Sequence, residues 1–245
     1  MHKAGRWLRR GLALLLGVAA AAMLLVGGWF GLQGWQMYRR AIRTTPIQGL
    51  YQQIRDRGDF VDCGQLPPLY IQAVISVEDR RFESHPGIDL AAIARALMTN
   101  LRTRSLAEGG STITQQLAKN ELFTQEKELT RKAAEVFAAF ALEHTYTKQQ
   151  ILEMYVNTIY FGSGYYGIYD AAQGYFGCAP SQLEDWQAVV LAGLPNAPSA
   201  YSPDKNPRLA LERTRAVLRR MADHGTITQD QALDLARQAE REYGG

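Results

Sequence analysis

The chain has 245 residues and a formal net charge of +3, a length that suits one membrane anchor and one folded domain of about 200 residues. Its first seven cations precede every acidic residue, which leaves 20 lysines and arginines against 24 acidic residues after Arg43. This remainder, with a net charge of −4, excludes a general nucleic-acid binder, because sequence-independent phosphate binding needs a basic face.

The N-terminal segment predicts a membrane anchor. Residues 11–36 are almost wholly apolar and uncharged, and a helix of about 20 such residues crosses a hydrocarbon core. We expect a basic cytoplasmic tail at residues 1–10 and a transmembrane helix at residues 11–36. A cleaved signal peptide is the alternative, although its apolar region usually has only about 7 to 15 residues. Cations flank the segment on both sides, so the positive-inside rule favours a cytoplasmic N-terminus only weakly.

The rest of the chain predicts a mainly α domain. We expect a polar connector at residues 37–66 and the domain at residues 67–245, because Pro67-Pro68 marks a break. Four sites have capping-box spacing, in which a hydroxyl and a side chain three residues later satisfy free N–H groups at a helix start. These pairs are Thr112 with Gln115, Thr147 with Gln150, Ser181 with Glu184, and Thr228 with Gln231.

Glu78 is the first candidate catalytic residue. It follows the apolar run 71–77, so we expect it at the edge of a core. Desolvation there would raise the pKa of its carboxyl group and make it a better base. The alternative is an ordinary acid paired with Arg80 or Arg81.

A second candidate lies in the run Ser111 to Asn120. A helix that starts at Thr112 would place Gln115, Gln116 and Lys119 on adjacent turns, and the N–H groups at a helix start suit an anion. The alternative is a capped surface helix with an exposed lysine.

A third candidate is the run Arg131-Lys132-x-x-Glu135. The alternative is a surface ion pair between Arg131 and Glu135, four residues apart on a helix.

Two patterns do not predict a cofactor site. The string Gly162-x-Gly164-x-x-Gly167 fits a dinucleotide fingerprint only as letters, because a helical segment precedes it and no βαβ unit surrounds it. The four histidines have no metal-ligand spacing, so we expect no metal among the site residues.

Together these runs resemble the peptidoglycan glycosyltransferases, glycosyltransferase family 51, over about residues 68–222. The resemblance begins with Glu78-Asp79-x-x-Phe82-x-x-His85-x-Gly87 and continues through the runs at 111–120, 131–135 and 148–157. Two departures stand out. Lys127 replaces the family's usual arginine, which keeps the charge but loses bidentate phosphate geometry, and Tyr169-Asp170 stands where the family usually has Glu-Ala.

The resemblance implies a lysozyme-like domain and specific residue roles. Glu78 would be the base on an acceptor hydroxyl, and Glu135 the second acidic residue of the site. The residues expected to bind substrate are Arg95, Gln115, Gln116, Lys119, Lys127 and Arg131.

The implied protein is a single-pass enzyme of the plasma (inner) membrane whose catalytic domain is extracytoplasmic. Its substrates would be lipid II and a growing lipid-linked glycan strand, joined with inversion, and its partners would include the membrane and other cell-wall synthesis proteins. A divalent cation, Mg²⁺ or Mn²⁺, stays open as a cofactor. Two alternatives also stay open: a membrane-bound muramidase or lytic enzyme, and a non-catalytic cell-wall scaffold.

Overall fold

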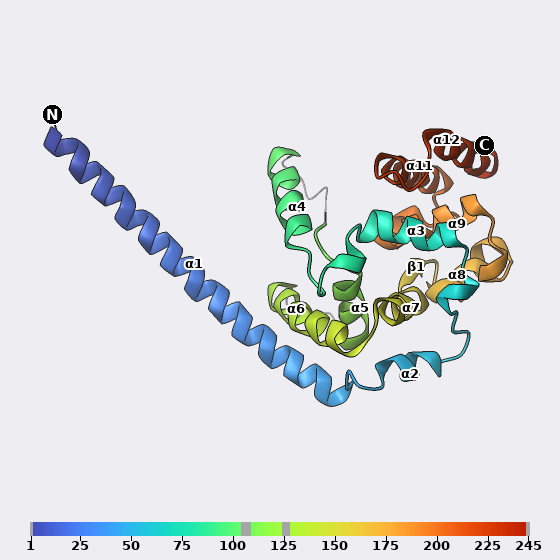
Figure 1. The fold of residues 1–245 in the computed structure, drawn as a ribbon, viewed down its shortest axis with the longest axis horizontal. Helices are drawn as coiled ribbons and strands as arrows, with labels where there is room; N and C mark the ends of the chain where they lie inside the picture. The colour runs from blue at the N-terminus through green and yellow to red at the C-terminus, as the bar shows by residue number, and fades with distance from the viewer. Residues whose placement is uncertain (1, 104–108, 124–127, 244–245) are drawn as a thin grey trace.

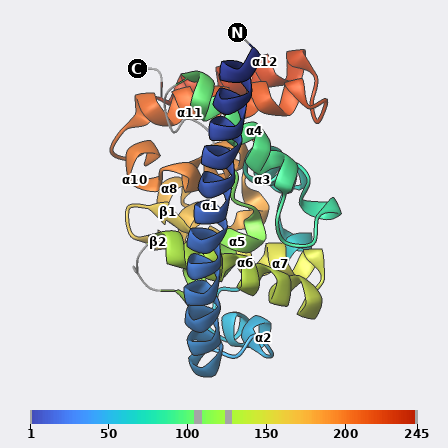
Figure 2. The same ribbon diagram turned by 90° about the vertical axis from the view of Figure 1, so that its left-hand side faces the viewer.

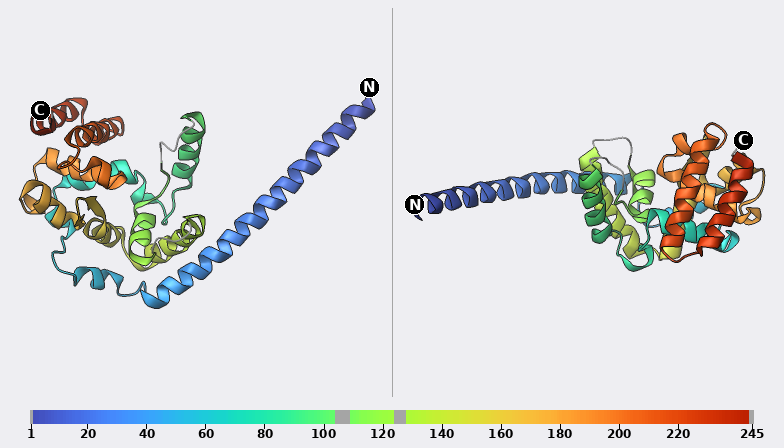
Figure 3. Two further views of the ribbon diagram at one scale, coloured as in Figure 1. Left: turned by 180° about the vertical axis from the view of Figure 1, so that it is seen from behind. Right: turned by 90° about the horizontal axis from the view of Figure 1, so that it is seen from above.

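In the computed structural model the chain forms a helical domain with a long N-terminal helix, as expected (Figure 1). The structure describes residues 2–103, 109–123 and 128–243. Helix α1 runs from His2 to Thr44 and leaves the domain as a rod, seen from above in Figure 3. Its segment Gly17–Thr44 is long and apolar enough to span a membrane.

The C-terminal part of α1 packs on helix α6 (Glu128–Thr145), and Figure 2 shows α1 passing along one side of the domain. A side chain at Gly34 would meet Ala133 of α6 at 2.5 Å, so the two backbones approach closely. The ring of Trp35 lies 5.2 Å from that of Phe137, edge to face. Helix α1 is therefore attached to the domain by direct packing.

Residues 37–66, the segment expected to be a polar connector, contribute to the core. Helix α1 continues through this segment to Thr44, and a short helix α2 covers Leu50–Arg55. Apolar side chains from the segment are buried, among them Ile47, Leu50, Ile54, Val61 and Leu66. Because their burial stabilises the domain, we describe this segment as part of it.

The remaining helices form two packed groups. In the first, α5 (Ile113–Leu122) lies between α6 and α7 (Lys148–Thr158), and α7 contacts α8 (Gly167–Phe176). In the second, α3 (Pro68–Glu78) packs on α9 and α11, and α12 packs on both α9 and α11. The second group's other bounds are Asp185–Gly193 for α9, Pro207–Asp223 for α11 and Gln229–Tyr243 for α12, with the short α10 at Pro198–Tyr201.

A two-stranded hairpin joins α7 to α8. Strands β1 (Tyr160–Gly162) and β2 (Tyr165–Tyr166) pair antiparallel. Gly162 and Gly167 have φ of +92° and +81°, which glycine adopts without strain. A Cβ at Gly167 would also lie 2.7 Å from the carbonyl oxygen of Asn157. The glycine string thus builds a hairpin against the end of α7, which agrees with the rejection of a dinucleotide fingerprint.

Three of the four expected capping boxes are present. Thr112, Thr147 and Thr228 each accept a hydrogen bond from the backbone N–H of the glutamine three residues later. The fourth expectation, Ser181 with Glu184, is wrong. Pro180 begins a 3₁₀ turn that contains Ser181, and α9 starts after Glu184, whose N–H donates to Gln187 Oε1.

Helix α4 (Leu90–Thr103) stands apart from both groups in Figure 1. Its apolar side chains recur at helical spacing and are exposed to solvent: Leu90, Ile93, Leu97, Met98 and Leu101. Such a stripe indicates a surface that contacts something apolar.

Candidate active site

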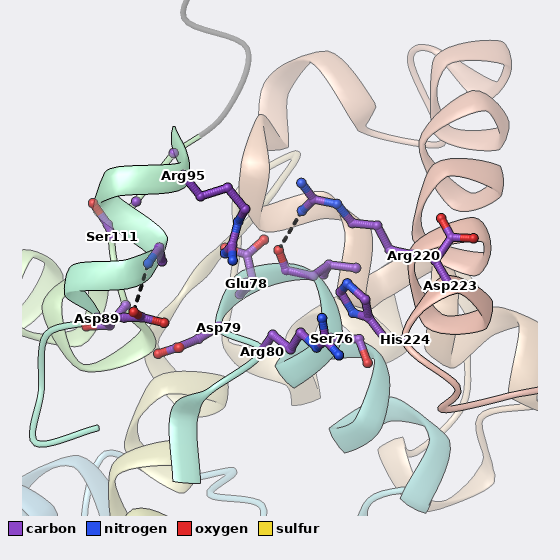
Figure 4. Close-up of a pocket in the computed structure, with 15 residues that line it drawn as sticks. Ser76, Glu78, Asp79, Arg80, Asp89, Arg95, Ser111, Arg220, Asp223 and His224 are labelled. Atoms are coloured by element: carbon purple, nitrogen blue, oxygen red, sulfur yellow. Dashed lines mark hydrogen bonds between the residues drawn. The ribbon is translucent and has the colours of Figure 1, made fainter. Parts of the chain in front are cut away.

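Glu78 lies at the C-terminal end of α3, in a cavity of about 290 Å³. The cavity is lined from α3, α4, the residues before α5, and α11 (Figure 4). The side chain of Glu78 is only 8% exposed. Its Oε2 accepts a hydrogen bond of 2.8 Å from Gln116 Nε2, whereas its buried Oε1 has no hydrogen-bond partner among the described residues. One oxygen of this carboxylate is therefore available to accept a proton.

The surroundings of Glu78 favour its protonated form. Burial raises the pKa of Glu78, while the hydrogen bond from Gln116 and the charges of Arg213 and Arg220 oppose the rise. The Nη2 atom of Arg213 lies 3.8 Å from Glu78 Oε1, too far for a hydrogen bond. The expected alternative, a pair with Arg80 or Arg81, is absent among the described residues. The partners of Glu78 there are Gln116 and Arg213, and Arg81 pairs with Asp89.

The other residues of the Glu78 run hold two helices together. Asp79 is buried and accepts hydrogen bonds from His85 Nε2, at 2.9 Å, and from the N–H of Ile113, at 3.0 Å. The N–H of Gly87 donates to His85 Nδ1, which assigns the histidine proton to Nε2. Because Ile113 is the first residue of α5, this network fixes the start of α5 against the end of α3.

Helix α5 uses its three candidate residues differently. Gln115 is buried in the capping box, where its Oε1 accepts from the N–H of Thr112. Gln116 donates to Glu78. Lys119 is exposed in the last turn. The start of α5 is thus capped, as the alternative of a capped helix predicts. In addition, Gln116 near that start donates a hydrogen bond to the candidate base.

Glu135 is fully buried in α6, so it is not part of a surface ion pair. Its Oε1 accepts from Arg131 Nε at 3.2 Å, and its Oε2 accepts from Lys132 Nζ at 2.7 Å. Lys132 also donates to Ser111 Oγ, which belongs to a residue that lines the Glu78 cavity. Glu135 thereby orders two cations beside that cavity.

The expected arginine and lysine positions are only partly covered by the structure. Arg95 of α4 lines the cavity and extends toward Glu78 in Figure 4. Lys127 lies outside the described residues. The sequence interpretation named Lys132 in its third run without giving it a role, and it missed Arg213 and Arg220. Arg220 Nη1 donates to the carbonyl oxygen of Val77, at the end of α3. The sequence signal for Arg213 and Arg220 was weak, because α11 reads as an ordinary amphipathic helix.

A metal site is not preformed in the described part of the chain. No group of three or more histidine, cysteine or acidic side chains there is arranged to hold an ion. At Glu135, both carboxylate oxygens already accept hydrogen bonds from cationic side chains, a setting that does not fit Mg²⁺ or Mn²⁺. We therefore derive no step through a metal.

Comparisons with known proteins agree with these motifs. The family model described as Transglycosylase matches residues 45–222. Penicillin-binding protein 1A of Aquifex aeolicus is 46% identical over 207 residues, which are 84% of this chain and 28% of that protein. A Cupriavidus necator protein named as a transglycosylase is 42% identical over 189 residues, 77% of this chain and 81% of its own length.

Among solved structures, penicillin-binding protein 1A from Haemophilus influenzae matches 72% of this chain and 17% of its own, with a TM-score of 0.44 and 23% identity. The chain thus spans about a quarter of the Aquifex protein and most of the Cupriavidus one. The family model covers well over half of the chain and includes both candidate carboxylates. The chain belongs to the transglycosylase family, the peptidoglycan glycosyltransferases that its motifs resemble.

Proposed function

We propose that this protein polymerises peptidoglycan glycan strands, by transferring a lipid-linked glycan chain to the 4-hydroxyl of lipid II with inversion. The observation that carries the proposal is Glu78, a buried carboxylate whose Oε1 lacks a hydrogen-bond partner among the described residues and borders a cavity. A group with a raised pKa accepts a proton more readily than an ordinary glutamate, once it is ionised.

In the proposed reaction, Glu78 Oε1 takes the proton of the acceptor hydroxyl while that oxygen attacks the donor's anomeric carbon. A new carbon–oxygen bond forms on one face of the sugar, and the bond to the diphosphate breaks on the other. The electron pair of the broken bond leaves with the diphosphate, so an α linkage becomes β. This is the logic of an inverting carboxylate, with diphosphate as the leaving group.

Cations stabilise the leaving group in this proposal. Diphosphate departs already charged, so it needs fixed positive groups more than an acid. We assign this role to Arg95, Lys119 and Arg131, and to Lys127 by its place in the sequence. Glu135 would hold Arg131 and Lys132 in position, because each of its oxygens accepts from one of them.

Membrane attachment supports the same function. Helix α1 is a candidate span, and the apolar stripe of α4 is exposed on a helix that stands apart from both helix groups (Figure 1). We propose that the N-terminus is cytoplasmic, that the domain lies outside the cytoplasm, and that α4 contacts the bilayer that carries the substrate. Confinement to one surface raises the local concentration of enzyme and lipid-linked substrate.

One assay tests the function and its main alternative. The full chain, in vesicles, is incubated with labelled lipid II and, separately, with purified glycan strands. The proposal expects long strands from lipid II and no shortening of the purified strands. Cleavage of the strands without polymerisation would identify a lytic enzyme instead, and neither reaction would favour a scaffold.

A further inference from the structure

Helix α7 carries a residue that is linked to the catalytic carboxylate through one intermediate side chain. Tyr155 belongs to the run at 148–157, which has no part in the reaction proposed above. Its side chain is only 1% exposed, and its hydroxyl group donates to Gln116 Oε1 over 3.4 Å. The same amide donates through Nε2 to Glu78 Oε2, at 2.8 Å. A chain of hydrogen bonds therefore runs from α7 through α5 to the carboxylate.

The Tyr155 hydroxyl is a fixed donor. Burial above all, and then the charge of Glu78, raises the pKa of Tyr155 well above its ordinary value, so the hydroxyl keeps its proton at neutral pH. Its acceptor among the described residues is Gln116 Oε1. If the amide turned by 180° about its last bond, this buried proton would face an NH₂ group and lose that acceptor. At 3.4 Å the hydrogen bond is long, so the larger effect is the cost of a buried hydroxyl without an acceptor.

The orientation of the amide matters most when Glu78 is protonated. An ionised carboxylate accepts from Gln116 Nε2 and thereby holds the NH₂ group toward itself. A protonated carboxyl would instead gain from a turned amide, because Oε1 could then accept the carboxyl proton. Tyr155 opposes that turn, so it denies the neutral form of Glu78 this hydrogen bond and leaves the ionised form with its own. A contact of this kind favours the ionised form.

Charged groups on other elements also face Glu78, but they are separate from the amide. Arg213 and Arg220 of α11 favour the ionised carboxyl, and Asp79, next along the chain, opposes it. Arg95 of α4 extends toward the carboxyl in Figure 4. The other titratable side chains that line the cavity are Arg80, Asp89, Asp223 and His224. In the described part of the chain the Tyr155 hydroxyl bonds to Gln116 and to none of these groups, so its loss leaves their contacts in place.

We propose that Tyr155 is a positioning residue for the catalytic base, which holds the Gln116 amide with its NH₂ group toward Glu78 and so keeps the carboxyl in the form that accepts a proton. This inference rests on the proposed function for the role of Glu78. Burial by itself favours the protonated carboxyl. Helix α7 limits that effect through a neutral amide, without a cation in hydrogen-bond contact with the base.

Tyr155→Phe tests the inference, because it removes the hydroxyl and keeps the ring. The pKa of Glu78 is measured by carbon-13 NMR of its carboxyl in the full chain in detergent, and the acid limb of the polymerisation rate is measured in parallel. We expect both midpoints to rise by about 0.4 to 1 pH unit, the range of one neutral hydrogen bond. At a pH well above the midpoint, the rate should match that of the wild type.

Two further variants separate the amide link from a general effect on the core. Tyr70 of α3 is also fully buried, but its hydroxyl has no hydrogen-bond partner among the described residues, so Tyr70→Phe should leave the carboxyl midpoint unchanged. Gln116→Leu should raise that midpoint by about 1 to 2 pH units, because a hydrogen bond to the ionised carboxylate is lost. Adding Tyr155→Phe to Gln116→Leu should then raise it no further.

Three results would overturn the inference. The first is a folded Tyr155→Phe chain with the midpoints of the wild type, even if its rate is lower at every pH, because a purely structural residue behaves in that way. The second, which does not depend on the folding of Tyr155→Phe, is an unchanged midpoint in Gln116→Leu. The third is a further rise when both substitutions are combined, since Tyr155 would then act on the carboxyl directly. A raised carboxyl midpoint in Tyr155→Phe, from a protein that does not polymerise lipid II, would instead overturn the proposed function and leave the effect of Tyr155 on Glu78 standing.

Discussion

One glutamate is buried at the C-terminal end of α3 and another in the middle of α6, but the surroundings of the two carboxylates are opposite in kind. At Glu78 one carboxylate oxygen has a single hydrogen bond from an uncharged amide, and the other has none among the described residues. At Glu135 both oxygens accept from cationic side chains. Burial without a bonded cation raises the pKa of the Glu78 carboxyl, whereas the Glu135 carboxylate is held between two cationic side chains. The first setting suits a group that exchanges a proton, and the second suits one that holds cations.

The largest expected effect is on catalysis by Glu78→Gln. The amide keeps the shape of the side chain but cannot take the acceptor's proton, so polymerisation should fall by about 10²- to 10⁴-fold. The rate is measured with labelled lipid II, and circular dichroism checks the fold. Near-normal turnover by the folded variant would end the assignment of Glu78 as the base.

Loss of a cation that stabilises the leaving group should lower the rate less than loss of the base. Lys119→Ala should lower kcat by roughly 10- to 100-fold, with little change in KM, because attraction to the diphosphate grows as it leaves. Since Lys119 is exposed, thermal stability should not change. A change in KM alone would make Lys119 a binding residue, and a matched Lys127→Arg variant should retain activity because it keeps the charge.

Replacing the two glutamates by glutamine should change the free energy of unfolding in opposite directions. Glu78→Gln removes a buried charge that has no bonded cation, so it should raise the free energy of unfolding by about 0.5 to 2 kcal/mol at pH 7. Glu135→Gln should lower that energy by about 1 to 3 kcal/mol, because Arg131 and Lys132 lose their partner. Thermal unfolding of the full chain in detergent measures both. Shifts of the same sign in the two variants would remove the distinction.

The smallest effect concerns a region that neither glutamate touches. Replacing Leu97 and Leu101 of α4 by glutamine should lower activity a few-fold on lipid II in vesicles and not on lipid II in detergent, since these side chains are already exposed. Equal losses in both settings would mean that α4 acts on the catalytic cavity and not on the bilayer.

Much of this arrangement follows from local sequence. The apolar run before Glu78 predicts its burial, and the Thr112 capping box predicts the start of α5. The partners are less accessible, because they depend on contacts between distant segments. Arg213 lies 135 residues from Glu78 along the chain, and nothing in its own helix indicates that contact.

The protonation of Glu78 itself is the most direct test of the account. A carbon-13 NMR titration of the side-chain carboxyl, assigned by its loss in Glu78→Gln, gives its pKa in the full chain. Burial raises that pKa above the ordinary glutamate value, so the carboxyl should titrate above pH 4.5. Polymerisation should then decline as the pH falls through the same midpoint, because only the ionised form accepts a proton. A midpoint at or below the ordinary value, or an acid limb of the rate that does not follow the carboxyl, would contradict Glu78 as a buried general base.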